Sequence, residues 1–476
     1  MKNHGGKGKR KRLDDDDGAR SSDELEEQSA GTGNQQQIRS SSSGTEGEGE
    51  GEGRSILFVV NILIGSSRAV ASLYKVDYPY PCSPRARARA RRLRPITTMD
   101  ATAGITYVPL HTRSRSRSRS RSRRWIVAIS ARRTTVFDAD AEVFISGPDL
   151  LSEKESPALV YVDVEDKIYA LSTFPQIKGE RDLEPWFEVL DLSSARVVDG
   201  RLQGCSWEEL PSPPCFPSPS RLAPHELRYP PMVTVHSYVL VGSYLLMSLK
   251  SATRHATHAF HTVSSKWQTV DDGKSLPFVG LATVHDAAAG VYLGESSADN
   301  RWWSRVGQEQ PALLTAYHIK LLPSNNDKAE EDNPAMKLSV TGIPVISSSE
   351  TTTTAGNGDG DGDGNAGGVV VKGIFCSSLH NNGGSLCSLN WRCRKRIRYS
   401  RDYDLLADEI YLPNKAYITL KTYQMEEDTC SLSLVEQEDK TIHSKKIAIP
   451  EQRGEHEFKI RTKSGGLVYP DYLTVL

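Results

Sequence analysis

Short apolar segments alternate with polar turns through residues 125–322, and this pattern constrains the fold more than any other feature of the 476-residue chain. Most segments are rich in Val, Tyr, Phe and Thr, and turns rich in Asp, Gly, Ser and Pro separate them at roughly ten-residue spacing. Such segments and spacing are typical of the strands of an all-β protein. Because no stretch carries a convincing helical periodicity, the sequence predicts an all-β fold.

Two stretches within this region resemble each other. "KIYALS…CSWEELPSPP" surrounds Trp207, and "YLLMSL…SSKWQTVDDGKSLPF" surrounds Trp267. In each, an apolar strand and a strand that ends in a polar turn precede a Trp-led strand that closes with Leu-Pro. The tryptophans are 60 positions apart (207 to 267), and the kelch repeat, a four-stranded blade, has a period of about 50 residues. A single blade cannot bury both faces of its sheet, so we expect several blades arranged radially as a propeller.

The order of several segments also resembles that of a known family. "SLYKVD", "TTVFDADAEVFISGPDLLSEKESPALVYVDVEDKIYAL", "CSWEELPSPP" and "SYVLVGSYLLMSL" follow one another, and "KSGGLVY" comes near the end. This order is similar to that of a kelch-like plant family of unknown function that is expanded in grasses, over residues 55–80 and 125–476. The resemblance implies a kelch-like β-propeller with a protein-binding role, and it supplies no catalytic residues. Since "LVGSYLL" keeps only Gly242 of the Gly-Gly pair usual in kelch strands, we expect irregular blades.

The length of the chain gives a blade number. Residues 125–476 without their polar inserts leave about 310 residues, which is roughly six blades at the kelch period. The apolar run at 56–65 predicts a buried strand because ten residues interrupted by Asn61 are too short for a membrane helix. We expect this strand to pair with the C-terminal strands and close the ring.

Changes in composition divide the chain into segments. A tail with almost no apolar residues cannot offset the entropy cost of ordering, so we expect it to be disordered. Dense arginine in the next low-complexity stretch should keep it extended through charge repulsion. The predicted segments are a disordered tail (1–54), N-terminal propeller strands (55–83), a basic Arg/Ala and Arg/Ser insertion (84–124), the first part of the propeller (125–322), a charged linker with a Gly/Asp-rich insertion (323–368) and the C-terminal part of the propeller (369–476).

The run "RSRSRSRSRSRR" at 113–124 raises an alternative function. Its seven Arg residues would contact phosphates without reading sequence. Phosphorylation of its five Ser residues would add roughly −7.5 to −10 charges and reverse its sign. No RNA-recognition strand of the [K/R]-G-[F/Y]-[G/A]-F-V-x-[F/Y] type accompanies the run, so a loop insertion is the simpler interpretation. The predicted phosphorylation sites are Ser114, Ser116, Ser118, Ser120 and Ser122.

A second basic cluster lies near the N-terminus. Lys9, Arg10, Lys11 and Arg12 follow one another in the polar tail, a pattern that fits a nuclear localisation signal and that also occurs by chance in charged tails. The start of the chain has no apolar segment of the signal-peptide kind. Seven cysteines without a CxxC pair favour reduced thiols. We therefore expect an intracellular protein, in the nucleus, the cytoplasm or both, without a membrane partner.

Other candidate sites have simpler structural explanations. His255, His258 and His261 are three residues apart, which gathers ligands poorly on either a strand or a helix. The spacing of Cys376, His380, Cys387 and Cys393 fits no familiar zinc site, and "DGDGDG" at 359–364 lacks the Glu that a calcium loop needs at position 12. The strand-like "WRCRKRIRY" at 391–399 would carry Arg on one face, either in solvent or against an acidic partner. We predict no metal and no cofactor.

No motif for a nucleotide-binding loop, a serine hydrolase or a zinc protease is present. The acids Asp163, Glu165 and Asp166 lie in a turn-like stretch and need no chemistry. We therefore predict a non-catalytic protein–protein interaction module that binds a protein partner through loops on one face of a propeller. Two other classes stay open: a nuclear RNA-associated or phosphorylation-regulated protein that acts through the Arg/Ser run, and an enzyme on a propeller scaffold.

Overall fold

The architecture comes from a computed structural model. It describes residues 54–64, 68–78, 91–92, 94–101, 105–112, 123–177, 184–217, 233–250, 255–296, 314–323, 336–344, 369–378, 385–393, 415–424, 451–461 and 467–475. These ranges contain strands, turns and loops and no helix, as the sequence predicts. Accordingly, they contain no helix that is long and apolar enough to cross a membrane. Residues 53–476 form one compact unit.

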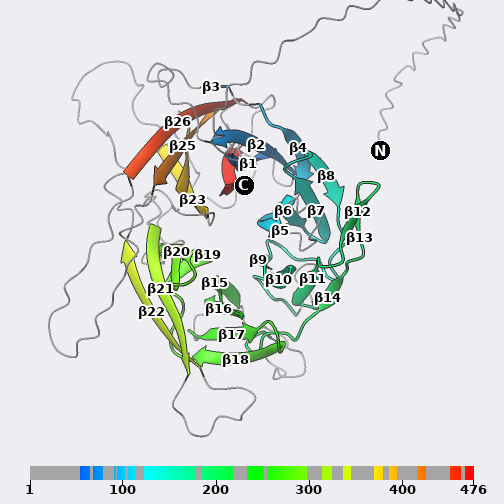
Figure 1. Cartoon of the computed structure of the whole chain (residues 1–476), viewed down its shortest axis with the longest axis vertical. Coiled ribbons are helices and arrows are strands. Elements are labelled where there is room, and N and C mark those ends of the chain that lie inside the picture. Colours follow the sequence, from blue (N-terminus) through cyan, green and yellow to red (C-terminus); the bar gives the residue numbers. More distant parts are fainter. Residues whose placement is uncertain are drawn as a thin grey trace, which may run out of the picture. The chain divides into compact units, whose positions relative to one another are not determined.

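The described strands pair as antiparallel meanders of four, and the order of pairing gives six such blades. Blades 4 and 5 join into one eight-stranded sheet only through a two-residue parallel pairing of β15 with β19. Figure 1 shows the sheets arranged in a ring. The predicted β-propeller is therefore confirmed.

Blade 1 combines strands from both ends of the chain, and blades 2 and 3 use the strands that follow β4. Blade 1 consists of β1 (Arg54–Ile64), β2 (Arg68–Tyr78), β4 (Thr97–Ala101) and β27 (Leu467–Val475). Blade 2 consists of β5 (Thr106–Thr112), β6 (Arg123–Ser130), β7 (Arg133–Asp138) and β8 (Val143–Ser146), with the hairpin β12 (Arg196–Val198) and β13 (Arg201–Gln203) against its outer edge. Blade 3 consists of β9 (Ala158–Val162), β10 (Lys167–Leu171), β11 (Phe187–Asp191) and β14 (Trp207–Glu209).

The other three blades follow in chain order. Blade 4 consists of β15 (Thr234–Val241), β16 (Tyr244–Lys250), β17 (Thr257–His261) and β18 (Lys266–Asp271). Blade 5 consists of β19 (Phe278–Asp286), β20 (Val291–Ser296), β21 (Leu314–Pro323) and β22 (Met336–Pro344). Blade 6 consists of β23 (Val369–Ser378), β24 (Ser385–Cys393), β25 (Lys415–Gln424) and β26 (Glu451–Arg461), with the short β3 (Arg91–Arg92) beside β26.

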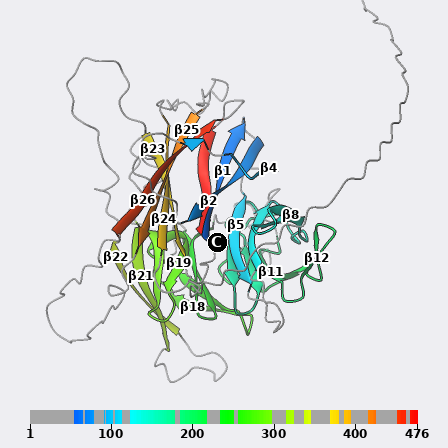
Figure 2. The ribbon, with the colours of Figure 1, turned by 45° about the horizontal axis from the view of Figure 1, so that its top comes forward.

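The two ends of the compact unit meet in blade 1. β1 pairs antiparallel with β27, from Ile56 opposite Val475 to Leu63 opposite Leu467. Figure 2 shows β1 and β27 side by side in a second view. The predicted closure of the ring by the strand at 56–64 is thus confirmed. Closure by a terminal strand removes two free sheet edges that would otherwise be open to pairing with other chains.

The buried side chains of the described residues form four clusters, and each is shared by two neighbouring blades, from the pair 1–2 to the pair 4–5. β10 shows how the sequence produces this arrangement. Its residues Ile168 and Ala170 face blade 2, whereas Tyr169 and Leu171 face blade 4. Because successive side chains of a strand point to opposite faces, a strand packed on both sides needs the continuous apolar run "KIYAL".

The structure corrects two of the predicted segment boundaries. The range 84–124, interpreted as one insertion, contains the blade strands β4 and β5. The range 323–368, interpreted as linker and insertion, contains the whole of β22. In both ranges the polar and charged flanks dominate the composition, although the strands between them pair with strands of their blades, and Val108 and Leu110 of β5 are 3% and 0% exposed.

Candidate functional site

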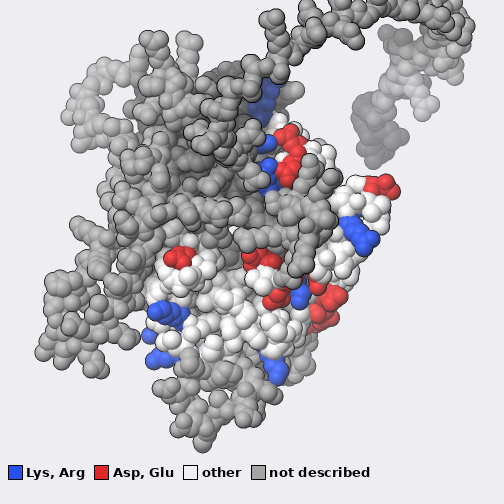
Figure 3. Space-filling model, in the orientation of Figure 1, with Lys and Arg blue, Asp and Glu red and all other residues white. Residues whose placement is uncertain are grey.

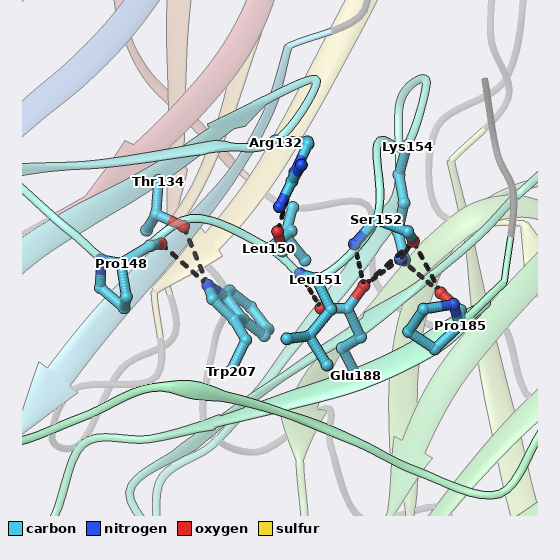
Figure 4. A network of polar contacts seen from close by, with 10 residues as sticks. All are labelled: Arg132, Thr134, Pro148, Leu150, Leu151, Ser152, Lys154, Pro185, Glu188 and Trp207. Atoms are coloured by element: carbon cyan, nitrogen blue, oxygen red, sulfur yellow. Dashed lines mark hydrogen bonds and ion pairs between the residues drawn. The ribbon is translucent and has the colours of Figure 1, made fainter. Parts of the chain in front are cut away.

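The strongest cluster of charged groups lies between blades 2 and 3, in the connection from β8 to β9. Lys154 in this connection and Glu188 in β11 form an ion pair, and both side chains are 0% exposed. Lys154 Nζ also donates to Ser152 Oγ at 2.6 Å and to the carbonyl of Pro185 at 2.7 Å. Figure 4 shows the three acceptors around the Lys154 ammonium group.

The Glu188 carboxylate is also bound by the backbone of the same connection. The amide of Leu151 donates to Oε2 at 2.7 Å, and the amide of Ser152 donates to Oε1 at 3.3 Å. The Lys154 ammonium group and the Glu188 carboxylate therefore each have several polar partners. Taking two ions out of water costs several kcal/mol each, and only such complete hydrogen bonding offsets that cost.

Further bonds tie this connection to blade 2 and to the outer strand of blade 3. Arg132 Nε donates to the carbonyl of Leu150 at 3.0 Å. The indole N–H of Trp207 donates to Thr134 Oγ1 at 3.0 Å and to the carbonyl of Pro148 at 3.2 Å. We call the ten residues drawn in Figure 4 the polar seam.

The polar seam brings a hydroxyl, an amine and a carboxylate together, a combination that can support proton transfer. A substrate, however, must reach the reacting atoms. Lys154 and Glu188 are fully buried, and Ser152 is 7% exposed. The geometry therefore holds the β8–β9 connection in place and offers no opening for a substrate at these groups.

A second group of residues lies at the end of the blades where the first and second strands, and the third and fourth strands, are joined. We call it the hairpin end. The turn Asp163–Asp166 joins β9 to β10 in blade 3, and the turn Thr262–Ser265 joins β17 to β18 in blade 4. Val164 and Val263 occupy their tips and are 73% and 74% exposed, the highest values among the exposed large apolar residues of the described chain.

One hydrogen bond connects these two turns. Thr262 Oγ1 donates to Glu165 Oε1 at 2.5 Å. The other oxygen of Glu165 accepts the Tyr169 hydroxyl at 3.0 Å and lies 3.4 Å from Lys167 Nζ. Val164 precedes Glu165 and Val263 follows Thr262 in the sequence. The hydrogen bond therefore holds the two valine-bearing turns in a fixed position relative to each other.

Two of the predicted features can be located. Trp207 and Trp267 occupy equivalent outer strands, β14 and β18, of consecutive blades. Each indole N–H donates to a proline carbonyl, of Pro148 for Trp207 and of Pro211 at 2.7 Å for Trp267. The internal repeat seen in the sequence is therefore a structural repeat. Asp163, Glu165 and Asp166 lie in a turn, as expected.

The structure does not bring the three histidines together. His258 Nδ1 lies 3.2 Å from Thr269 Oγ1, His261 Nδ1 lies 2.7 Å from Ser264 Oγ, and His255 is exposed. No group of three or more His, Cys, Asp or Glu residues suited to a metal occurs among the described residues. In blade 6 the register places Cys376 opposite Cys387.

The remaining predicted sites lie outside the described residues. These are the basic cluster Lys9, Arg10, Lys11 and Arg12, the Ser residues at 114, 116, 118, 120 and 122, His380, the Asp/Gly run at 359–364 and residues 394–399 of the basic strand.

Sequence reasoning missed the polar seam and the tip valines. Lys154 and Glu188 are 34 positions apart, and no local pattern links a lysine in a polar connection to a strand glutamate. The turns that carry the tip valines do share a sequence pattern. "DVEDK" at 163–167 and "TVSSK" at 262–266 share Val at the second position and Lys at the fifth, although β-branched residues are unusual in turns.

The closed ring of four-stranded blades defines the chain as a β-propeller. The sequence pattern of the family described as "Protein of unknown function (DUF1668)" matches residues 58–354, more than half of the chain. The chain belongs to this family. No curated protein sequence matches it.

Solved structures give further similarities. The chain is similar to the β-propeller domain of Cps50 (Swd1) from Myceliophteria thermophila, with 8% identity over 66% of this chain and 83% of that one, at a TM-score of 0.26. It is also similar to a putative 6-phosphogluconolactonase from Bacteroides fragilis, with 8% identity over 90% of this chain and 100% of that one, at a TM-score of 0.32.

Proposed function

We propose that this propeller is a non-catalytic module that binds a protein partner at its hairpin end. The observation that carries the proposal is the exposure of Val164 and Val263 at turn tips that the Glu165–Thr262 bond fixes. Loops that a rigid scaffold holds in position often carry binding residues. By contrast, the ion pair of the polar seam, Lys154 and Glu188, is closed to solvent.

The equivalent placement of Trp207 and Trp267 supports a kelch-like character for blades 3 and 4. Kelch-type propellers and other ring-shaped repeats present their connections on one face, where binding residues can vary without disturbing the sheets. We extend this arrangement to the present chain as part of the proposal.

Proximity labelling of the intact protein in cells, followed by binding assays with the purified candidates, tests the proposal. We expect at least one protein that binds the purified chain directly and reversibly. Turnover of a small molecule by the purified chain, together with no direct protein partner, would contradict it.

The Arg/Ser run carries the second candidate function, an RNA-associated or phosphorylation-regulated role. Thr112, the last residue of β5, directly precedes the run and pairs with Arg123, one of the last two residues of the run, which begin β6. On the face shown in Figure 3, the described residues form small separate groups of acidic and basic charge within a mostly uncharged surface. The described residues on this face give RNA no continuous basic path, so this candidate rests on the run itself.

Deletion of residues 113–122 tests this candidate. It removes all of the run except Arg123 and Arg124, which belong to β6, and leaves the blade strands β4 and β5 in place, which deletion of the whole range 84–124 would not do. The candidate predicts salt-sensitive RNA binding that the deletion abolishes, measured by filter binding at low and high salt. Equal RNA binding by the intact and the shortened protein would rule it out.

A further inference from the structure

The turns that carry Val164 and Val263 have the same backbone form. Each contains four residues between its strands, and the fourth residue, Asp166 or Ser265, has a φ of 55°. A left-handed residue at this position closes the hairpin and leaves the second residue at the tip. The tip side chain is therefore set by the turn geometry and cannot fold back into the core.

Two other turns of this form allow a comparison. In blade 2 the turn at 139–142 ends with Glu142 at a φ of 55°, and in blade 5 the turn at 287–290 ends with Gly290 at 68°. Their second residues are Asp140 and Ala288. Only blades 3 and 4, whose turns are bonded to each other, carry a large apolar tip in this set of four.

An aromatic pair extends the apolar character on the blade 4 side. Tyr244 at the start of β16 lies opposite His261 at the end of β17, and their ring centroids are 4.7 Å apart. His261 directly precedes the turn that carries Val263. Blade 4 thus adds a partly exposed ring surface next to its tip valine.

The blade 3 turn carries the carboxylates of Asp163, Glu165 and Asp166, and Lys167 pairs with only one of them, Glu165. Asp163 is exposed and has no hydrogen-bond or ion-pair partner among the described residues. Two tyrosines report the negative potential. Burial, followed by the nearby Asp166 and Asp163, raises the pKa of Tyr161, and burial, followed by Glu165 and more weakly Asp191, raises the pKa of Tyr169. Negative charge disfavours a phenolate and favours a cation brought to the same place.

We propose that this surface binds a protein segment that places an aliphatic side chain against Val164 and Val263 and a Lys or Arg side chain against the carboxylates. The inference rests on the proposed function and specifies its partner. The apolar contact would supply affinity through desolvation, and the charge contact would set orientation and the rate of association. An acidic segment would meet Asp163 as a like charge and would be rejected.

A selection from a library of random twelve-residue peptides, made on the immobilised full-length chain, tests the proposal. The affinities of selected peptides are then measured by fluorescence anisotropy. We expect the selected peptides to combine Leu, Ile or Val with a neighbouring Lys or Arg. We expect the double substitution Val164→Ser/Val263→Ser to weaken their binding at least tenfold, and Asp163→Lys to weaken it by a similar factor.

Matched controls come from another hairpin. Val197, which is 44% exposed in β12, and Asp199 in the following turn offer the same residue types away from the two bonded turns. Val197→Ser and Asp199→Lys should leave the affinity within about twofold, and circular dichroism should show that all variants stay folded.

Three outcomes would overturn the proposal: selection of acidic peptides, selection of none, or affinities that the tip valines do not affect. These failures differ from failure of the proposed function. If proximity labelling and direct binding still identify a protein partner for the intact chain, the binding role stands and only this surface and its chemistry are wrong.

Discussion

Blade 3 contacts its two neighbours through different chemistry. On the side of blade 2, the polar seam holds a fully buried lysine–glutamate pair and the hydrogen bonds of Trp207. On the side of blade 4, Phe187 and Phe260 lie edge to face at 4.8 Å, and Trp267 packs against both at 5.5 and 5.1 Å. We call this second contact the aromatic seam.

The two contacts tolerate different substitutions. Apolar side chains add stability roughly in proportion to the area they bury, so losses accumulate as they are removed. A buried ion pair is balanced against its own desolvation, so the loss of one partner costs far more than the loss of both. The polar seam therefore specifies the path of the β8–β9 connection, and the aromatic seam supplies stability.

The largest effect is expected from breaking the ion pair. Lys154→Met leaves the Glu188 carboxylate buried without its counter-ion, which should lower the free energy of unfolding by about 3–5 kcal/mol. Guanidinium denaturation followed by tryptophan fluorescence measures the change. The double substitution Lys154→Met/Glu188→Leu should recover most of the loss, and a double variant no more stable than the single one would contradict this account of the polar seam.

An effect of comparable size, but without rescue, is expected in the aromatic seam. Phe260 is 0% exposed, and Phe260→Ala should cost about 3–5 kcal/mol because the ring leaves a cavity. Adding Phe187→Ala should lower the stability further in the same denaturation assay. If the second truncation restored stability, the two seams would not differ in the way proposed.

The tryptophans allow a smaller, matched comparison. Trp207→Phe removes an indole N–H from two acceptors in a buried position, which should cost about 1–3 kcal/mol. Trp267→Phe removes one hydrogen bond in an exposed position, and should cost about 0.5–1.5 kcal/mol. Thermal unfolding of the two variants compares these losses of stability. A larger loss for Trp267→Phe than for Trp207→Phe would argue against a stronger polar contribution on the side of blade 2.

The smallest effect concerns the reactivity of two thiols. One cysteine packs against the core cluster on each side of blade 3. Burial raises the pKa of Cys215, beside the aromatic seam, to about 12, and burial with help from Asp191 raises the pKa of Cys205, beside the polar seam. A raised pKa means less thiolate at a given pH, so both should react slowly with iodoacetamide at pH 8. Mass spectrometry should find Cys205 alkylated before Cys215, and faster alkylation of Cys215 would contradict its burial.

The sequence predicted the fold well where the residues of a single strand indicate how that strand is packed. The apolar run of β10 and the two Trp-led strands are local signals of blades packed on both sides, and they led to the correct ring. β4 and β5 were missed since their arginine-rich flanks dominate the composition, while their burial depends on blade 1, blade 3 and each other. The polar seam needed the structure, because Lys154 and Glu188 meet only after two blades have packed.

The central claim is that the seams build the propeller and the hairpin end of blades 3 and 4 binds the partner. The most direct test measures the affinity of one selected peptide for Val164→Ser/Val263→Ser and for Lys154→Met/Glu188→Leu, both at a temperature where they are fully folded. We predict a loss of at least tenfold for the valine variant and less than twofold for the seam variant. A large loss for the seam variant with unchanged binding by the valine variant would contradict the claim.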